Sequence, residues 1–358
     1  MQALVTGGGG FLGSSIARAL LKQGNNVSVI GRGRYPHLPS SIKAFQGDIR
    51  DYDFVNKSLK DIDTIFHTAA IPGIWGPAKE FYSINVQGTE NIIKACRNNL
   101  VRKLVFTSSP SVVFGNSNLE GVDESIPYPD EYLCDYPRTK AIAEKLILDA
   151  NCSNLFTVAI RPHLIWGPGD PHLVPRILQK ASNNKLMIVG EGKNQVDIIY
   201  IDNAVSAHLK ACEALGPNGN VAGKAYFVSD GKPVILWEWI ANLLNRMDMP
   251  NVSRKISYDT AAKIGATLEG VYGIFRIKSE PPMTRFLASQ LATSHYFNIS
   301  RAKKDDVTII KANYLPTKKN KPIEDFLPDC GFQKNEDSWT INVNNKFKSP
   351  DFIEVVDK

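Results

Sequence analysis

Near the start of the chain, four consecutive glycines (residues 7–10) lie between two regular patterns. Residues 5–13 read VTGGGGFLG, with an apolar run before them and an amphipathic helical pattern after them. Such a run is unfavourable inside a helix or strand, because glycine loses the most backbone entropy on folding. Between a strand and a helix, the spacing Gly7-x-x-Gly10-x-x-Gly13 permits a tight turn, close approach of a pyrophosphate and close helix–strand packing. It therefore predicts a dinucleotide-binding loop; the alternative is a glycine-rich connector without a ligand.

Short apolar runs alternate with helical patterns through the first half of the chain. The runs are almost continuously apolar, as in strands of a parallel sheet that is covered on both faces. Strands are expected at residues 2–6, 26–30, 42–46, 62–69, 102–109 and 156–162, with helices between the first two strands, over 78–99 and over 136–150. This alternation predicts an α/β fold, a Rossmann-type doubly wound parallel sheet.

The pattern becomes irregular after residue 162, which indicates a second unit. Helices are expected at residues 174–182, 202–215 and 235–247, and strands over VDIIYI (196–201) and KAYFVSD (224–230). We expect a dinucleotide-binding domain of residues 1–165, to which 191–232 return, and a smaller C-terminal substrate domain of 166–190 and 233–330. Residues 331–358 form a tail of unassigned role, in which Trp339, Ile341 and Val343 alternate like an edge strand.

Composition narrows the class of protein. The 358 residues are 43% hydrophobic and 22% charged, as in a globular chain with an ample core. No segment has the pattern of a signal peptide or a transmembrane span, and the five cysteines lack the spacing of a disulfide framework or a zinc site. We therefore expect free thiols, no metal site and a cytoplasmic location. The net charge of +6 comes without a nucleic-acid-binding motif, so no nucleic-acid partner is expected.

The end of the second expected strand distinguishes two dinucleotides. NAD-binding folds usually place a carboxylate there, which accepts hydrogen bonds from the adenosine ribose. This chain has Gly31 and Arg32 instead, with Arg34 close behind. An arginine can hold a 2′-phosphate through several charged donors, so NADP(H) is the preferred cofactor and NAD(H) the alternative. Solvated loop arginines are the other interpretation. Asp48, in GDI after the third strand, is expected near the adenine.

Tyr136 and Lys140 are four residues apart at the start of an expected helix, and so share one helical face. A neighbouring ammonium lowers the pKa of a tyrosine toward the range that suits proton transfer. Ser108, Ser109 and Ser111 follow the fifth strand, at the carboxyl edge where open α/β sheets bind ligands. The combination predicts that a serine hydroxyl holds a substrate oxygen with which Tyr136 exchanges a proton. A surface tyrosine and lysine on an amphipathic helix is the alternative.

These motifs resemble the extended short-chain dehydrogenases/reductases. The resemblance rests on TGGGGFLG, HTAA (67–70), NVQGT (85–89), TSS (107–109), YPRTK (136–140) and RPHLIWGPGD (161–170), and it covers about residues 1–315. Longer runs around the same motifs, with PPMTRFLASQLATSHYFNISRAKK, resemble the 3β-hydroxysteroid dehydrogenase-like branch. RPHLIWGPGDPH is most similar to its bacterial 2-alkyl-3-oxoalkanoate reductases of olefin synthesis. NYLP (313–316) only approximates the Gly-Tyr-x-Pro element of that family.

The resemblance implies roles for the residues that match the motifs. Tyr136 is implied as the proton donor or acceptor, and Lys140 as the group that binds the nicotinamide ribose. Ser109 would orient the carbonyl, with Ser108 as the fallback, and Asn85 would stabilise the active-site helix. The implied cofactor contacts are Gly7, Gly10, Phe11, Leu12, Gly13, Arg32, Asp48, Ile49, Ala69, Ala70, Thr107, Tyr136, Lys140, Pro162, His163 and Ile165.

The substrate side is less sharply defined. His163 would meet the carboxamide or the substrate, or else be a buried, hydrogen-bonded histidine. Arg285 is a candidate to pair with a substrate carboxylate, or else to form a structural ion pair. Residues 261–277 are apolar at helical spacing and interrupted by charges. They are interpreted as a lid over an apolar substrate, as domain core, or as a weak peripheral membrane contact.

Taken together, the motifs predict an NAD(P)H-dependent oxidoreductase. It would interconvert a 3-keto and a 3-hydroxy group on a hydrophobic small molecule, first of all as a 2-alkyl-3-oxoalkanoate reductase. The alternatives are a 3β-hydroxysteroid or sterol-4-carboxylate 3-dehydrogenase, a nucleotide-sugar epimerase or reductase, and a non-enzymatic NADP-sensing regulator. The superfamily also implies a homodimer.

Overall fold

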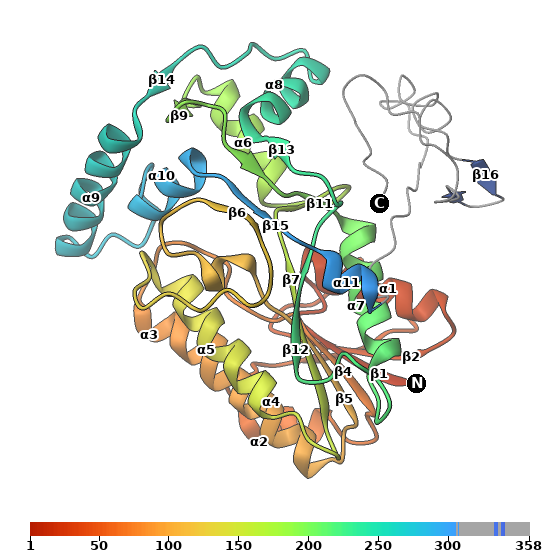
Figure 1. Ribbon diagram of the computed structural model, residues 1–358. Helices are drawn as coiled ribbons and strands as arrows, with labels where there is room; N and C mark the ends of the chain where they lie inside the picture. Colours follow the sequence, from red (N-terminus) through yellow and green to blue (C-terminus); the bar gives the residue numbers. More distant parts are fainter. Residues whose placement is uncertain (306, 308–332, 336–337, 341–358) are drawn as a thin grey trace.

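The central sheet has seven parallel strands in the order β12-β7-β5-β4-β1-β2-β3 (Figure 1). The computed structural model of the chain describes residues 1–305, 307, 333–335 and 338–340. The strands are β1 (Gln2–Thr6), β2 (Asn26–Gly31), β3 (Lys43–Gln46), β4 (Thr64–His67), β5 (Lys103–Thr107), β7 (Phe156–Pro162) and β12 (Lys224–Val228). The predicted doubly wound parallel sheet is therefore confirmed. The fourth and fifth strands are shorter than expected, since 68–69 and 108–109 belong to the loops at the ligand-binding edge.

Helices cover both faces of the sheet because neighbouring strand residues point to opposite sides. Val5 of β1 packs into the cluster that holds the helices α1 (Phe11–Lys22) and α7 (Ile201–Ala214). Leu4 packs into the cluster of the opposite face. The helices of that face are α2 (Tyr52–Ser58), α4 (Gly88–Asn98) and α5 (Asp135–Asp149), which lie together in Figure 1. Burial on both faces explains why the strands read as unbroken apolar runs.

The helix predicted over 78–99 is interrupted by a π-helical stretch. The segment consists of α3 (Ala78–Phe81), the π-helix η1 (Tyr82–Gln87) and α4. The spacing of apolar residues does not distinguish this short π-helical stretch from a regular α-helix. The pattern therefore predicts one continuous helix. Such turns are frequent at functional sites, and η1 carries Asn85.

A smaller unit sits above the carboxyl edge of the sheet (Figure 1). Its helices are α6 (Leu173–Ser182), α8 (Leu236–Arg246), α9 (Tyr258–Ile274) and α10 (Arg285–Ala292). A four-stranded sheet in the order β13-β10-β15-β6 joins them, built from β6 (Leu119–Val122), β10 (Gln195–Val196), β13 (Val234–Ile235) and β15 (His295–Phe297). The core of this unit contains Val196, Trp237 and Ile240.

Short elements complete the described chain. They are the 3-10 helix η2 (Pro110–Val113), β8 (Ile165–Trp166), β9 (Ile188–Val189), β11 (Ile199–Tyr200), β14 (Lys255–Ile256), α11 (Ser300–Lys304), β16 (Gln333–Asn335) and β17 (Ser338–Thr340). The single strand expected over 196–201 is wrong. Its residues divide between β10, β11 and the start of α7, so each piece pairs with a different partner. Trp339 lies in β17, which pairs with β16, whereas Ile341 and Val343 lie outside the described residues.

The apolar segment 261–277 forms α9 and the turn after it. Only Ala261 and Gly265 of this helix are buried, whereas Ile274 and Phe275 are 78% and 72% exposed. The segment is therefore not a core helix. None of the described helices has the length and apolar character needed to cross a membrane.

Candidate active site

The glycine loop joins β1 to α1 in the geometry that the spacing predicts. Gly7 has a φ of +67°, and its N–H donates to the Ile30 carbonyl at 2.8 Å. A Cβ on Gly13 would lie 2.4 Å from the Gly7 oxygen, so a side chain there is excluded. Gly10 is the N-cap of α1, and no described side chain caps its first N–H groups. These donors are therefore free to bind an anionic ligand.

A cleft of about 810 Å³ opens from this loop, between the carboxyl edge of the central sheet and the smaller unit. It brings together every residue that the resemblance assigned to the cofactor. Its lining includes Gly7, Gly10, Phe11, Leu12, Gly13, Arg32, Asp48, Ile49, Ala69, Ala70, Thr107, Tyr136, Lys140, Pro162, His163 and Ile165, together with Ser108 and Ser109. Asn85 and Arg285 do not line it.

Tyr136 and Lys140 lie on the first turns of α5 and both face the cleft. The Lys140 ammonium donates to the Thr107 carbonyl at 2.5 Å and sits 4.0 Å from the centre of the Phe106 ring. Burial lowers the pKa of Lys140 to about 7, an effect that the Glu144 carboxylate opposes. Burial also raises the pKa of Tyr136, against a hydrogen bond with Ser109 that lowers it. The expected lowering of the tyrosine pKa by lysine is thus wrong for this structure, since desolvation dominates.

The two candidate serines face different partners. Ser109 is close enough to Tyr136 to lower the pKa of its hydroxyl, and its Oγ lies 2.9 Å from the Ser111 Oγ. Ser108 is 4% exposed, and its Oγ is on the side of Glu144. Adjacent residues of an extended chain point to opposite sides. Of the two serines, only Ser109 therefore faces the tyrosine.

Arg32 is placed to meet an anion at the far end of the cleft. It lines the cleft beside Tyr35, and among the described residues its guanidinium makes no ion pair. Asp48 is held by Arg50, which donates to it at 2.6 Å and, through this hydrogen bond, keeps the pKa of the carboxyl below its usual value. These features fit a dinucleotide. The open N-terminus of α1 and the glycine loop, which has no side chains to obstruct a ligand, would hold its phosphates. Arg32 would lie at its adenosine.

Comparison with known proteins identifies the family. The model of the 3-beta hydroxysteroid dehydrogenase/isomerase family matches residues 4–257, which is most of the chain. The chain belongs to the 3-beta hydroxysteroid dehydrogenase/isomerase family. It is a nicotinamide-dinucleotide-dependent oxidoreductase of the extended short-chain dehydrogenase/reductase type.

Individual relatives narrow the likeness. A 2-alkyl-3-oxoalkanoate reductase of Stenotrophomonas maltophilia is 44% identical over 308 residues, 85% of this chain and 93% of the relative. The human sterol-4-alpha-carboxylate 3-dehydrogenase, decarboxylating, is 33% identical, covering 85% of this chain and 82% of the relative. Among solved structures, UDP-glucuronic acid 4-epimerase of Bacillus cereus in complex with NAD has 27% identity and a TM-score of 0.62, covering 72% of this chain and 87% of that chain.

In this member of the family, Asn85 does not line the cleft but hydrogen-bonds to two segments next to it. Its Nδ2 donates to the Thr139 hydroxyl of α5 at 3.0 Å, and its Oδ1 accepts the Ile71 N–H at 2.9 Å. Its carbonyl accepts the Thr89 hydroxyl, which in turn accepts from the ring of buried His67. The π-helical stretch thus connects α5 with the loop after β4.

A buried ion pair next to Lys140 is the main feature that sequence reasoning missed. Glu144 is fully buried one helical turn beyond Lys140, and it accepts from Arg161 of β7 at 2.5 and 2.9 Å. The Tyr128 hydroxyl donates to the same carboxylate at 2.6 Å. A glutamate on the buried face of α5 and an arginine within the apolar run FTVAIRP were the available signals, because such charges are rarely buried unless paired.

His163 joins the two units of the family fold. Its Nε2 lies 2.6 Å from the Nδ1 of His295 in β15, whose own Nε2 donates to the Gln290 carbonyl at 2.9 Å. Because a carbonyl only accepts, His295 carries its proton on Nε2, and His163 is the donor to its Nδ1. Burial and His295 hold the pKa of His163 well below its ordinary value. The buried hydrogen bond that the sequence analysis named as one interpretation of His163 is therefore present, and His163 also lines the cleft.

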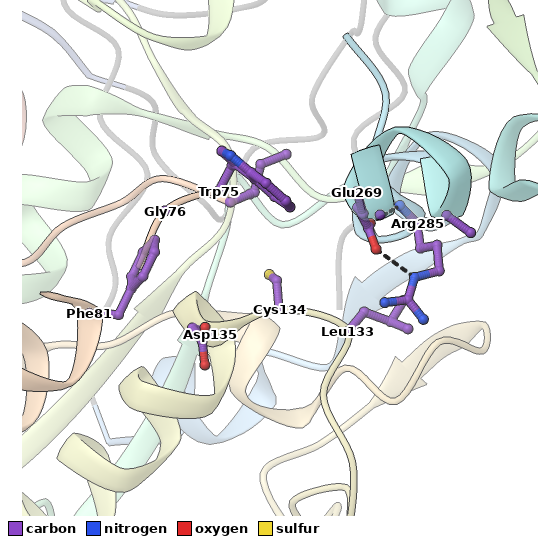
Figure 2. Close-up of a pocket in the computed structure, with 11 residues that line it drawn as sticks. Trp75, Gly76, Phe81, Leu133, Cys134, Asp135, Glu269 and Arg285 are labelled. Carbon is purple, nitrogen blue, oxygen red and sulfur yellow. Dashed lines mark hydrogen bonds and ion pairs between the residues drawn. The ribbon is translucent and has the colours of Figure 1, made fainter. Parts of the chain in front are cut away.

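Arg285 lies outside the cleft, on the wall of a second cavity (Figure 2). Its Nε donates to the Glu269 carboxylate at 2.7 Å, and its backbone N–H donates to the other carboxylate oxygen at 2.6 Å. This is the structural ion pair that the sequence analysis named as the alternative. Arg285 is thus not among the residues that line the main cleft.

Proposed function

We propose that this protein is an NADPH-dependent reductase of 2-alkyl-3-oxoalkanoates. The observation that carries the proposal is the position of Ser109, Tyr136 and Lys140 in a cleft whose opposite wall is apolar. That wall consists of Leu173, Ile177, Leu186, Leu236, Ile240, Phe286, Leu287 and Leu291. The 44% identity to a 2-alkyl-3-oxoalkanoate reductase, over 93% of that relative, supports the same substrate class.

The proposed reduction uses one hydride and one proton. The bound cofactor supplies the hydride to the carbonyl carbon. The Tyr136 hydroxyl donates its proton to the carbonyl oxygen, and Ser109 donates a hydrogen bond to the same oxygen, so that a secondary alcohol forms. Lys140, one helical turn away on the same helix, is assigned to the nicotinamide ribose. The raised pKa of Tyr136 keeps its hydroxyl protonated, which suits the reductive direction.

An acid substrate also needs a cation in the cleft. Lys180 lines the cleft near the apolar wall. Its ammonium makes no hydrogen bond or ion pair with a described residue. Burial lowers its pKa, and neighbouring Arg176 lowers it further while Glu280 opposes this. A carboxylate beside Lys180 would favour the charged ammonium. We assign it as the partner of the substrate carboxylate, in the place that Arg285 cannot fill.

A substrate panel tests the proposed function. The stable alcohols are supplied in the reverse direction with NADP⁺ or NAD⁺, and formation of reduced nicotinamide is followed. The panel holds 2-alkyl-3-hydroxyalkanoates, a 3β-hydroxysteroid, a sterol 4-carboxylate and UDP-sugars. We expect kcat/KM to be highest for the 2-alkyl-3-hydroxyalkanoates with NADP⁺. Preferred oxidation of a sterol carboxylate would replace the proposal with the sterol dehydrogenase that the human relative suggests. Tight NADPH binding without any turnover would indicate a sensor.

The preference for NADPH is proposed to depend on Arg32. Replacing Arg32 by Ala should raise the Kd for NADPH about tenfold or more, since a charged hydrogen bond is worth about 1.5–3 kcal/mol. The Kd for NADH should change by less than about twofold, because NADH lacks the 2′-phosphate. Both are measured by titrating the reduced cofactor and following its fluorescence. Arg34→Ala is the matched control, since Arg34 does not line the cleft. Equal losses for both cofactors in R32A would contradict the assignment.

A further inference from the structure

A second cavity of about 530 Å³ lies directly beside the reaction cleft. Figure 2 shows Trp75 and Phe81 on one side of it, Glu269 and Arg285 on the other, and Cys134 between them. Its volume falls in the range of about 300–1,000 Å³ that ligand sites occupy. Nothing in the proposed proton or hydride transfer uses this space.

The two cavities meet at the catalytic tyrosine. Ile74 lines both of them. Cys134 and Asp135 line the second cavity, and the next residue, Tyr136, lines the reaction cleft. A substrate whose carbonyl is held by Tyr136 therefore lies at the border between the two spaces.

The wall of the second cavity mixes apolar side chains with charged ones. Its charged side chains are already paired: Asp135 with Arg138 at 2.6 Å, and Glu269 with Arg285 at 2.7 Å. Burial raises the pKa of Cys134 to about 12, so the thiol is neutral and behaves as a small apolar group. The remaining side chains of the wall are Ile74, Trp75, Phe81, Leu133 and Ala266. A hydrocarbon chain that enters this space would lie against these apolar side chains.

We infer that the second cavity binds one of the two hydrocarbon chains of the substrate, while the apolar wall of the cleft binds the other. This inference rests on the proposed function. A 2-alkyl-3-oxo acid carries two chains on adjacent carbons, and they diverge at the reacting carbonyl. One apolar space on each side of Tyr136 matches that branching, with Ile74 at the division.

Substrates in which each chain is lengthened separately test the inference. The series consists of four 2-alkyl-3-hydroxyalkanoates, with the C2 chain and the C3 chain each short or long, oxidised with NADP⁺. Ala266→Trp narrows the second cavity from an exposed position of α9, so the fold is retained. Leu173→Trp narrows the other space. Thr267→Trp adds the same bulk to the next residue of α9, which does not line the cavity.

Ala266→Trp should lower kcat/KM by about tenfold or more for the substrates in which one of the two chains, either that on C2 or that on C3, is long. The reason is that even one methylene in an apolar pocket changes kcat/KM roughly tenfold. Leu173→Trp should penalise the other chain, and Thr267→Trp neither. Thr267→Trp should oxidise the short–short substrate within about twofold of the unchanged protein. The inference is overturned if A266W behaves like T267W, or if A266W and L173W penalise the same chain. Absence of turnover of all four substrates by the unchanged protein overturns the proposed function, and the inference with it.

Discussion

Replacement of Tyr136 by Phe is expected to lower kcat by about a hundredfold to ten-thousandfold, the usual contribution of a positioned general acid. The variant lacks only the hydroxyl that hydrogen-bonds with Ser109 and faces the cleft. The ring and the fold of α5 are kept, so Kd for NADPH should stay within about threefold. Steady-state oxidation of the best alcohol substrate, together with fluorescence titration of NADPH, measures the two quantities separately.

Tyr132→Phe is the matched control for this experiment. Its hydroxyl donates to the Val112 carbonyl at 2.8 Å, and it does not line the cleft. Loss of that bond should cost about 1 kcal/mol of stability and leave kcat nearly unchanged. If Y136F kept more than about a tenth of the original kcat, Tyr136 would not be the proton donor.

Replacement of Glu144 by Gln is expected to lower the free energy of unfolding by about 3–5 kcal/mol, because it leaves Arg161 charged and buried without a counter-ion. Both side chains of the pair are at most 4% exposed. Burial acts to raise the pKa of Glu144, but the hydrogen bonds and the charge of Arg161 outweigh it and lower the pKa from 4.5. Stabilisation by this carboxylate is therefore present above about pH 4.5 and lost as the pH falls through the lower folded-state value. Urea unfolding as a function of pH measures both effects.

The same variant should also change the pH profile of catalysis. Glu144 raises the pKa of Lys140 against the effect of burial. Removal of the Glu144 charge lowers the pKa of Lys140 further. The alkaline limb of the pH profile of oxidation should therefore shift to lower pH than in the unchanged protein. Asp149→Asn, an exposed change of the same chemistry on the same helix, should alter stability by less than about 0.5 kcal/mol. A stability loss in E144Q as small as that in D149N would mean that the ion pair contributes little.

Local patterns in the sequence were sufficient for the scaffold and for part of the site. Apolar runs covered on both faces predict the parallel strands, and the Gly7–Gly10–Gly13 spacing predicts the loop between β1 and α1. Tyr136 and Lys140 are neighbours because four residues make one helical turn. In each case the decisive relation lies within a few residues, where the geometry of one strand, one turn or one helix settles it.

The tertiary structure alone decided the relations between distant segments. His163 meets His295 across 132 positions of sequence, and Arg285 pairs with Glu269 instead of facing the cleft. The direction of the Tyr136 pKa shift likewise depends on how completely packing removes water, which no motif records. The sequence by itself determined a dinucleotide fold with a tyrosine and a lysine on one helical turn, because periodicity and short spacings encode local geometry. Which serine joins them, which carboxylate supports them and where a second apolar space opens depend on side-chain directions after the elements pack.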